Sequence, residues 1–294
     1  MRDLLKISDL SETELIELLE TAIAVKKDPS SVRGVAEGKT VAVLFEKPSL
    51  RTRFSVEAAL ARIGAHPIGA YDREVGLGSR EPIDDAAHVL ERYVDAIVMR
   101  TFAHARVKEL ADAASVPVIN ALCDEHHPLQ ALADLQTIAE AKCGGDVRAL
   151  KSVKVAWIGD GNNVARSLIE ACWLVRAEVA VACPPGYEPG GIAVTRDPLE
   201  AVTGADVVVT DTWFSMGQES EADERRTIFE PYQVTPHLME QAARGAIFLH
   251  CLPAHRGEEV APEVIDGRAS RVWDEAENRL HTTLSVFLHL WGLA

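Results

Sequence analysis

The chain has 294 residues, of which 47% are hydrophobic and 26% are charged, and its formal net charge at pH 7 is −15. This length is sufficient for two domains with a substantial core, and the composition is that of a globular protein. The negative charge argues against non-specific binding to nucleic acid or anionic membranes, so an anionic ligand requires a local cluster of basic side chains.

The five cysteines are scattered along the sequence and include no C-x-x-C pair. Such a set indicates reduced thiols in a cytosolic protein, rather than a disulfide framework or a zinc site. The first residues contain no signal-peptide hydrophobic region, and no apolar run reaches the length of a membrane span. We therefore expect a cytoplasmic protein without a membrane or nucleic-acid partner.

Strand and helix patterns alternate along the whole chain. A capping box formed by Ser11 and Glu14 should open a helix that ends at 26–27. The alternation predicts an α/β fold with two similar-sized domains, each a parallel sheet flanked by helices. Strands are expected at 41–44, 94–101, 116–122, 153–158, 177–183, 207–210 and 246–249, and further helices at 55–63, 106–114, 128–142 and 282–293.

The glycine pair after Lys142, with the basic and polar stretch that follows it to Lys151, indicates a hinge between the domains. The predicted domains are 1–142 and 150–276. The C-terminal helix within 277–294 is expected to pack back on the first domain.

The stretch Phe45–Phe54, with the sequence F-E-K-P-S-L-R-T-R-F, follows the first apolar strand. Its proline disfavours helix before it, so the next helix should begin close to Ser49. Free backbone N–H groups and the helix dipole favour an anion there. Thr52 adds a second hydroxyl donor, while Arg51 and Arg53 add guanidinium groups. The same residues also fit a capped helix with two solvated arginines.

Polar side chains also follow the later strands of the first domain. Arg100 ends a predicted strand, where it could form a structural ion pair or contact a ligand. Pro128 suits a first helical turn, so His127 and Gln130 flank a second helix N-terminus. His126 and His127 are adjacent and no third ligand has suitable spacing, so we expect no metal.

The second half carries three comparable strand ends. The turn G-D-G-N-N after 153–158 has no third glycine and no acidic residue on the next strand, so no dinucleotide cofactor is expected. Asp211 ends a strand, where a carboxylate fits recognition of an amine but also a simple turn in a surface loop. Cys251 follows the last strand, where a cysteine is more often a buried small hydrophobe than a reactive group.

These motifs resemble those of the carbamoyltransferases, and they occur in the same order. F-E-K-P-S-L-R-T-R-F resembles the carbamoyl-phosphate loop, although most ornithine enzymes have threonine where this chain has Leu50. H-P-L-Q, G-D-G-N-N and H-C-L-P resemble the next motifs, and D-T-W-F-S-M-G-Q-E resembles the signature loop of the ornithine branch. The matches extend from residue 45 to residue 281, so the resemblance covers essentially the whole chain.

The resemblance implies transfer of the carbamoyl group of carbamoyl phosphate to the δ-amine of L-ornithine, giving L-citrulline and phosphate in arginine metabolism. Carbamoyl phosphate would bind first, and the domains would then close around ornithine. No metal or organic cofactor is implied, and the assembly would be a homotrimer or a multiple of trimers. The alternatives are an N-acylated-ornithine or putrescine carbamoyltransferase, or a catalytically inactive metabolite-binding relative.

The resemblance also assigns roles to individual residues. Arg100 and His127 would stabilise the negative charge that develops on the carbamoyl oxygen. Asp211 and Cys251 would bind the amine and favour loss of its proton, because a free alkyl ammonium has a pKa of about 10.4. Those four are the expected catalytic residues. The expected carbamoyl-phosphate site comprises Ser49, Leu50, Arg51, Thr52, Arg100, His127, Gln130, Cys251, Leu252 and Arg279. The expected ornithine site comprises Asn163, Asp211, Ser215 and Met216.

The chain departs from the family in the loop Arg73–Glu81. Relatives usually place a glutamine or lysine there, which reaches the phosphate bound by the neighbouring subunit. The corresponding position in this chain is Gly76, which has no side chain to make that contact. Either Ser79 or Arg80 replaces it, or the contact between subunits is missing; the loop could also be a simple flexible turn.

Overall fold

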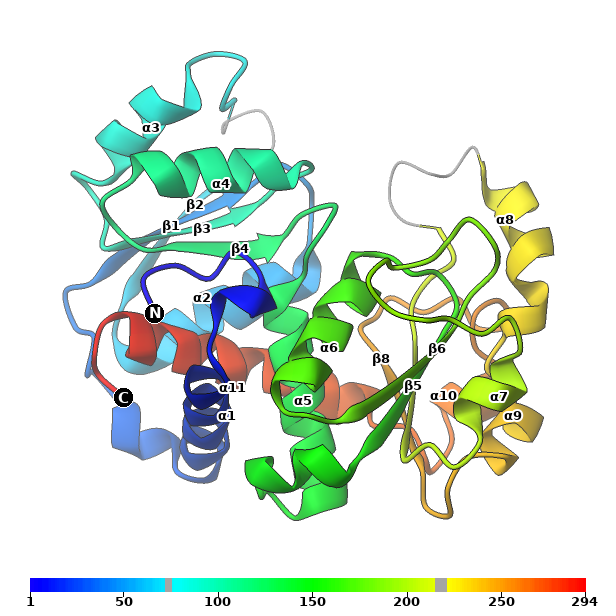
Figure 1. Ribbon diagram of the computed structural model, residues 1–294. Coiled ribbons are helices and arrows are strands. Elements are labelled where there is room, and N and C mark those ends of the chain that lie inside the picture. Colours follow the sequence, from blue (N-terminus) through cyan, green and yellow to red (C-terminus); the bar gives the residue numbers. More distant parts are fainter. Residues whose placement is uncertain (72–75, 215–220) are drawn as a thin grey trace. The chain divides into compact units, whose positions relative to one another are not determined.

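The computed structural model describes residues 1–71, 76–214 and 221–294 (Figure 1). The chain divides into two compact units, Met1–Ala133 with Glu277–Ala294 and Asp134–Ala276. Within the described ranges, each unit has a four-stranded parallel sheet with helices around it, which confirms the predicted fold class. None of the described helices combines the length and the apolar character needed to cross a membrane.

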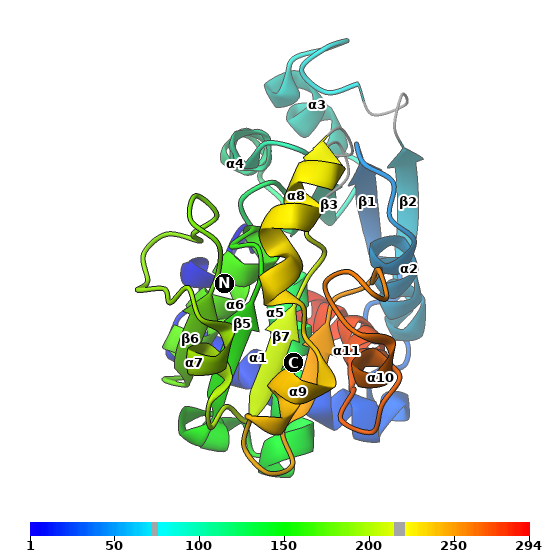
Figure 2. The same cartoon turned by 90° about the vertical axis from the view of Figure 1, so that its right-hand side faces the viewer.

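The sheet of the first unit has the strand order β2-β1-β3-β4. Its central strands are almost entirely buried, which explains their apolar sequences. Helices α3 and α4 cover one face of this sheet and α2 lies on the other (Figures 1 and 2). The strands are β1 (Thr40–Phe45), β2 (His66–Tyr71), β3 (Ala96–Arg100) and β4 (Val118–Leu122). The helices are η1 (Ile7–Asp9), α1 (Glu12–Lys27), η2 (Pro29–Val32), α2 (Leu50–Ile63), α3 (Ile83–Leu90), α4 (His104–Ala113) and the start of α5 (Pro128–Cys143).

The sheet of the second unit has the order β6-β5-β7-β8. Helices α7, α9 and α10 pack against one face through an apolar cluster, and α6 lies on the opposite face (Figure 1). The strands are β5 (Lys154–Ile158), β6 (Glu178–Ala182), β7 (Val207–Thr210) and β8 (Ile247–His250). The helices are η4 (Val147–Ser152), α6 (Asn163–Leu174), α7 (Pro198–Val202), α8 (Ala222–Phe229), η6 (Glu230–Tyr232), α9 (Pro236–Glu240) and α10 (Pro262–Ile265).

The predicted strands occur where the sequence placed them, with ends that differ by at most two residues. The prediction for the last helix was wrong, because α11 (Val272–Leu290) begins ten residues before the expected start at 282. Two acidic residues in its first turn, Asp274 and Glu275, suit the positive end of the helix dipole. Arg279 therefore lies inside this helix and not at its start.

The later part of α11 belongs to the first unit and packs beside α1 (Figure 1). Ser285 Oγ donates to the carbonyl oxygen of Leu18 at 2.7 Å, and Lys26 Nζ donates to Asn278 Oδ1 at 2.8 Å. These contacts confirm the expectation that the C-terminal helix packs on the first domain.

Candidate functional site

The first turn of α2 has the local structure that the sequence predicts for an anion site. Ser49 is the N-cap, and its Oγ accepts a hydrogen bond from the backbone N–H of Thr52 at 3.3 Å. The helix begins at Leu50, whose side chain is 68% exposed. The positive end of the helix dipole thus lies beside Arg51 and Thr52, at the carboxyl end of β1.

Five buried polar residues form one hydrogen-bonded cluster in the first unit. We call them the anion cluster: Thr52, Arg100, His127, Gln130 and Arg279. The guanidinium of Arg279 donates to Gln130 Oε1 at 2.6 Å and to Thr52 Oγ1 at 3.2 Å, and lies 3.5 Å from His127 Nε2. Arg100 Nη1 donates to the same Thr52 oxygen at 3.5 Å. Residues predicted separately from four parts of the sequence therefore meet at one place.

The anion cluster is strongly electropositive. Burial, together with Arg279, Arg100 and Arg51, holds the pKa of His127 well below its ordinary value. Its imidazole is therefore neutral near pH 7, and it can donate an N–H to an oxygen without adding a further charge. Three guanidinium groups around a neutral imidazole suit an anionic ligand with a polarised carbonyl oxygen.

The two arginines of the F-E-K-P-S-L-R-T-R-F stretch have different environments. Arg53 Nε donates to Glu57 Oε1 at 2.9 Å, and its guanidinium carbon lies 4.3 Å from the centre of the Tyr71 ring. Arg53 therefore belongs to the surface of α2 and does not join the anion cluster. Arg51 is half-buried, and its charge acts on His127.

The loop around Gly76 uses the hydroxyl of Ser79 internally. Gly76 has φ of +54°, in the left-handed region that favours glycine, and an added Cβ would lie 2.6 Å from Arg80 Cδ. Ser79 Oγ donates to the carbonyl oxygen of Gly76 at 2.9 Å, so that hydroxyl closes its own turn. Of the two predicted substitutes for the family's glutamine, Arg80 is the better candidate.

In the second unit, Asp211 and Cys251 lie together at the carboxyl ends of β7 and β8. Asp211 is buried, and its carboxylate accepts from Asn162 Nδ2 at 2.8 Å and from the backbone N–H of Thr212 at 2.8 Å. Cys251 Sγ donates to Asp211 Oδ1 at 3.1 Å. The two residues that the resemblance assigns to one amine are therefore direct neighbours.

The thiol of Cys251 is protonated. Burial and the carboxylates of Asp211 and Glu275 hold the pKa of Cys251 well above its ordinary value. A thiol in this state is a hydrogen-bond donor and a weak nucleophile, so the geometry does not favour covalent catalysis.

Asn162 is a residue that the sequence analysis did not assign to the site. Its Oδ1 caps α6 by accepting from the backbone N–H groups of Val164 and Ala165, while its Nδ2 bonds Asp211. The predicted residue, Asn163, follows it and directs its Oδ1 to the Val164 N–H at 3.1 Å. The paired asparagines of G-D-G-N-N were the available signal, because one of them had to cap the helix.

His250 fixes the backbone that carries Cys251. Its Nδ1 accepts from the backbone N–H of Leu252 at 2.9 Å, so its proton lies on Nε2, which donates to Glu259 Oε1 at 3.2 Å. His250 and Glu259 are both fully buried. Leu252 has φ of +56°, a strained value for a leucine that this contact stabilises.

Asp211, His250 and Cys251 also place atoms of the kind that bind metals within 4.8 Å of one another. Both ring nitrogens of His250 are already engaged, and the thiol of Cys251 keeps its proton. This arrangement suits hydrogen bonding to a polar ligand better than coordination of an ion. The remaining predicted residues, Ser215 and Met216, lie outside the described part of the chain.

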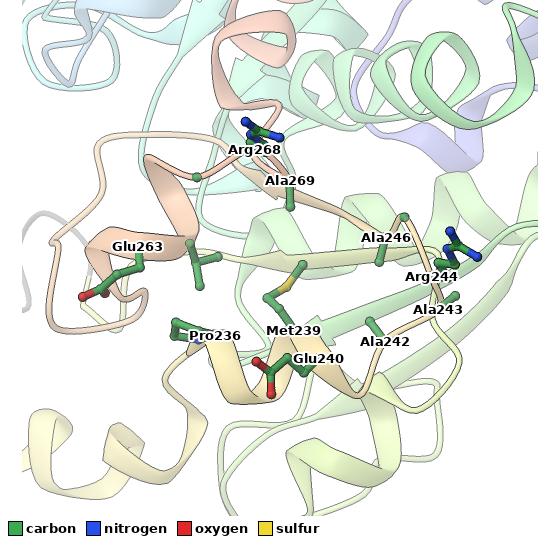
Figure 3. Close-up of a pocket in the computed structure, with 13 residues that line it drawn as sticks. Pro236, Met239, Glu240, Ala242, Ala243, Arg244, Ala246, Glu263, Arg268 and Ala269 are labelled. Carbon is green, nitrogen blue, oxygen red and sulfur yellow. The ribbon is translucent and has the colours of Figure 1, made fainter.

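A separate pocket of about 410 Å³ opens in the second unit beside α9 and α10 (Figure 3). None of the predicted site residues is among the described residues that line it. Cavity volume alone therefore does not identify the functional site.

Two family models match the chain. The aspartate/ornithine carbamoyltransferase, carbamoyl-P binding domain covers residues 2–140, and the aspartate/ornithine carbamoyltransferase, Asp/Orn binding domain covers residues 151–290. The chain belongs to the aspartate/ornithine carbamoyltransferase family. This confirms the resemblance found in the sequence, and it makes the chain a carbamoyltransferase.

Individual members of the carbamoyltransferase family match over almost their full length. The ornithine carbamoyltransferase of Carboxydothermus hydrogenoformans is 48% identical, with 99% of this chain and 98% of that protein covered. The anabolic ornithine carbamoyltransferase of Pyrococcus furiosus is 47% identical, with 99% and 96% covered. The crystal structure of ornithine carbamoyltransferase from Thermus thermophilus has a TM-score of 0.90 at 44% identity, with 99% of each chain covered. The Pyrococcus furiosus enzyme has a TM-score of 0.93 at 47% identity, with 99% and 97% covered.

Asp160 lies in the same turn as Asn162 and is largely buried. Arg225 Nη1 donates to its Oδ2 at 2.9 Å, and burial outweighs this contact and raises the pKa of Asp160 to about 6. Its ordinary value is 3.8. The folded protein therefore binds this proton more tightly than the unfolded chain. The stabilisation is complete below pH 3.8 and is lost as the pH rises through about 6.

We expect Asp160→Asn to remove this loss of stability at higher pH. As the pH rises from 5 to 8, the free energy of unfolding of the variant should rise relative to that of the parent by up to about 2 kcal/mol, in addition to a pH-independent cost of losing the ion pair with Arg225. Denaturant unfolding across this pH range measures the difference, with Asp223→Asn as a control because that carboxylate is fully exposed. A difference that is constant with pH would contradict the assignment.

Proposed function

We propose that this carbamoyltransferase transfers the carbamoyl group of carbamoyl phosphate to the δ-amine of L-ornithine, giving L-citrulline and phosphate. The observation that carries the choice of acceptor is the contact between Cys251 Sγ and Asp211 Oδ1, at 3.1 Å. A buried carboxylate with a neutral thiol suits a side-chain amine. Aspartate enzymes have proline in place of this cysteine. The chain's similarity to named ornithine carbamoyltransferases supports the same choice.

Carbamoyl phosphate is assigned mainly to residues of the first unit. The N–H groups at the start of α2, with Ser49, Arg51 and Thr52, hold its phosphate. Arg100 and His127 donate to the carbamoyl oxygen, and Gln130 accepts from the carbamoyl nitrogen. The 2.6 Å bond from Arg279 orients Gln130 and adds positive charge. Leu50 contributes through its backbone, since its side chain is exposed. Cys251 and Leu252, which the resemblance also assigns to carbamoyl phosphate, belong to the second unit.

Ornithine is assigned to the second unit. Asp211 and Cys251 bind the δ-amine, and Asn163 binds the amino-acid end together with Ser215 and Met216. The ammonium must lose one proton before its nitrogen attacks the carbamoyl carbon. The new C–N bond then forms and the bond to the phosphate oxygen breaks. The nitrogen, which gave its first proton to solvent, passes its second proton to the departing phosphate, so the products are citrulline and hydrogen phosphate. Donors on the carbamoyl oxygen stabilise the charge of this step, each by about 3 kcal/mol.

Formation of citrulline from carbamoyl phosphate tests this function, with ornithine, N-acetylornithine, putrescine and aspartate offered as separate acceptors. We expect turnover with ornithine and at most a few per cent of that rate with the others. Turnover with another acceptor would be consistent with the proposed carbamoyl-phosphate site, but it would overturn the assignment of ornithine as the acceptor. A folded protein inactive with every acceptor would favour a binding role without catalysis.

We also propose a cytoplasmic homotrimer, or a multiple of trimers, with Arg80 reaching the phosphate of a neighbouring subunit. Exposed apolar side chains on the first unit support association. Leu50 and Phe54 lie one turn apart on α2 and are 68% and 64% exposed, and Ile68 on β2 is 50% exposed.

Phe54→Glu should weaken this assembly, because it places a charge among the apolar side chains. We expect the mass measured by light scattering to fall from that of a trimer towards that of a monomer at micromolar concentration. Trp173→Glu is the matched control, because Trp173 is 48% exposed on α6 of the other unit. A parent that is already monomeric would contradict the trimer itself.

A further inference from the structure

Arg225, on α8 of the second unit, is a buried cation that the mechanism above does not use. Its side chain is 9% exposed, whereas that of the next residue, Arg226, is 45% exposed. Its Nη1 donates to Asp160 Oδ2 at 2.9 Å and to the carbonyl oxygen of Trp213 at 2.7 Å. Burial of a charge is costly, so a cation that joins two loops in this way suggests a function beyond stability.

Two hydrogen-bond partners of Arg225, Asp160 and Trp213, flank the acceptor residues. Asp160 precedes Asn162 by two positions, and Trp213 follows Asp211 by two positions. Asn162 Nδ2 and Asp211 Oδ2 are themselves joined at 2.8 Å. Arg225 therefore connects the two segments that carry the ends of this hydrogen bond.

The surroundings of Arg225 leave little room for adjustment. Its guanidinium carbon lies 4.9 Å from the centre of the Tyr187 ring and 5.9 Å from that of Phe229. The backbone N–H of Gly161 donates to the Tyr187 carbonyl oxygen at 2.9 Å, and a Cβ at Gly161 would lie only 2.4 Å from that oxygen. The turn that carries Asn162 and Asn163 is thus packed tightly against the segment that carries Tyr187. A shift of the Tyr187 segment would therefore move this turn.

Arg225 is also held from its own helix. Its Nε donates to Glu221 Oε2 at 3.1 Å, one turn earlier on the chain. With Asp160 and Trp213, this contact fixes the plane of the guanidinium from three segments. A lysine has one charged nitrogen and no planar fork, so it cannot reproduce these contacts together.

We infer that Arg225 is a positioning residue for the amino-acid acceptor. It acts through Asp160 and Trp213 to hold Asn162, Asn163 and Asp211 at the spacing that the acceptor requires. This inference rests on the proposed function and deepens it, because it names a residue that touches neither substrate. Carbamoyl phosphate is assigned mainly to residues of the other unit, so its binding should depend little on Arg225.

Steady-state kinetics of Arg225→Leu and of its matched control Arg226→Leu test the inference. For Arg225→Leu we expect the KM for ornithine to rise at least about tenfold, with kcat and the KM for carbamoyl phosphate within about threefold of the parent. Arg226→Leu should leave all three constants within about threefold. Equal effects on both substrates, or equal effects in the two variants, would overturn the positioning role.

A second pair of variants separates positioning from stability. Arg225→Leu leaves the Asp160 carboxyl buried without its cation, so adding Asp160→Asn should recover thermal stability while the KM for ornithine stays high. If the double variant recovered both the thermal stability and the KM for ornithine of the parent, Arg225 would have only a structural role. Arg225→Lys, which keeps the charge, should fold and show an intermediate KM. It replaces Arg225→Leu in the comparison if the leucine variant does not fold.

The parent enzyme in the same assay tests the proposed function separately. Activity of the parent on a different acceptor would refute ornithine as the substrate. The KM values of Arg225→Leu and Arg226→Leu relative to the parent would then be measured with that acceptor. The choice of ornithine and the positioning role of Arg225 can therefore fail independently.

Discussion

Arg51→Ala should lose at least about 10³-fold in kcat/KM for carbamoyl phosphate while remaining folded. Arg51 lies in the first turn of α2, where its charge and the free backbone N–H groups are proposed to bind the same phosphate. Within the described part of the chain, its guanidinium makes no hydrogen bond that would hold the fold together. The midpoint of thermal unfolding should therefore change by no more than about 2 °C.

Arg53→Ala is the matched control for this prediction. The two arginines are two positions apart on α2, but Arg53 pairs with Glu57 and stacks on Tyr71. An exposed pair of this kind contributes little, so kinetics and stability should stay close to those of the parent. An active Arg51→Ala variant, or an equally damaged Arg53→Ala variant, would mean that the anion site is wrongly placed.

Asp211→Asn should lower kcat/KM for ornithine by about 10²- to 10⁴-fold. Asparagine keeps the shape of the side chain and can still accept the hydrogen bond from Cys251, but it removes the negative charge that binds the amine. The KM for carbamoyl phosphate should stay within about twofold, because that substrate is assigned mainly to residues of the other unit. Kinetics with each substrate varied in turn measure both effects.

Asp223→Asn is the corresponding control, since the side chain of Asp223 is fully exposed on α8. It should leave the kinetics unchanged. If Asp211→Asn affected both substrates equally, Asp211 would have to act on the whole active site and not on the amine.

Much of the fold could be predicted because the central strands are buried on both faces. Val41–Leu44 and Val207–Thr210 are nearly continuous apolar runs, as strands inside a parallel sheet must be. By contrast, the sequence did not predict β2. It contains Pro67 and Gly69 and is largely exposed at the edge of its sheet, so its sequence shows no apolar run.

Some residues of the candidate site could likewise be predicted from the sequence, and others could not. Ser49, His127 and Asp211 could be predicted because each follows a strand or opens a helix within a recognisable motif. Arg225 could not be predicted, because it stands beside Arg226 in a charge-rich helix, and no local pattern separates the buried arginine from the exposed one. Only tertiary packing makes that distinction, through Asp160 and Tyr187.

The distance in sequence between Thr52 and Arg279 has a consequence for biosynthesis. The two residues share a hydrogen bond across 227 positions. A nascent chain can form the start of α2 early, but it cannot complete the anion cluster until residue 279 has left the ribosome. Domains usually fold in order as they emerge, and contacts of such long range form late. The ability to bind carbamoyl phosphate should thus be among the last properties that the protein acquires, and ligand binding would report completed synthesis of this chain.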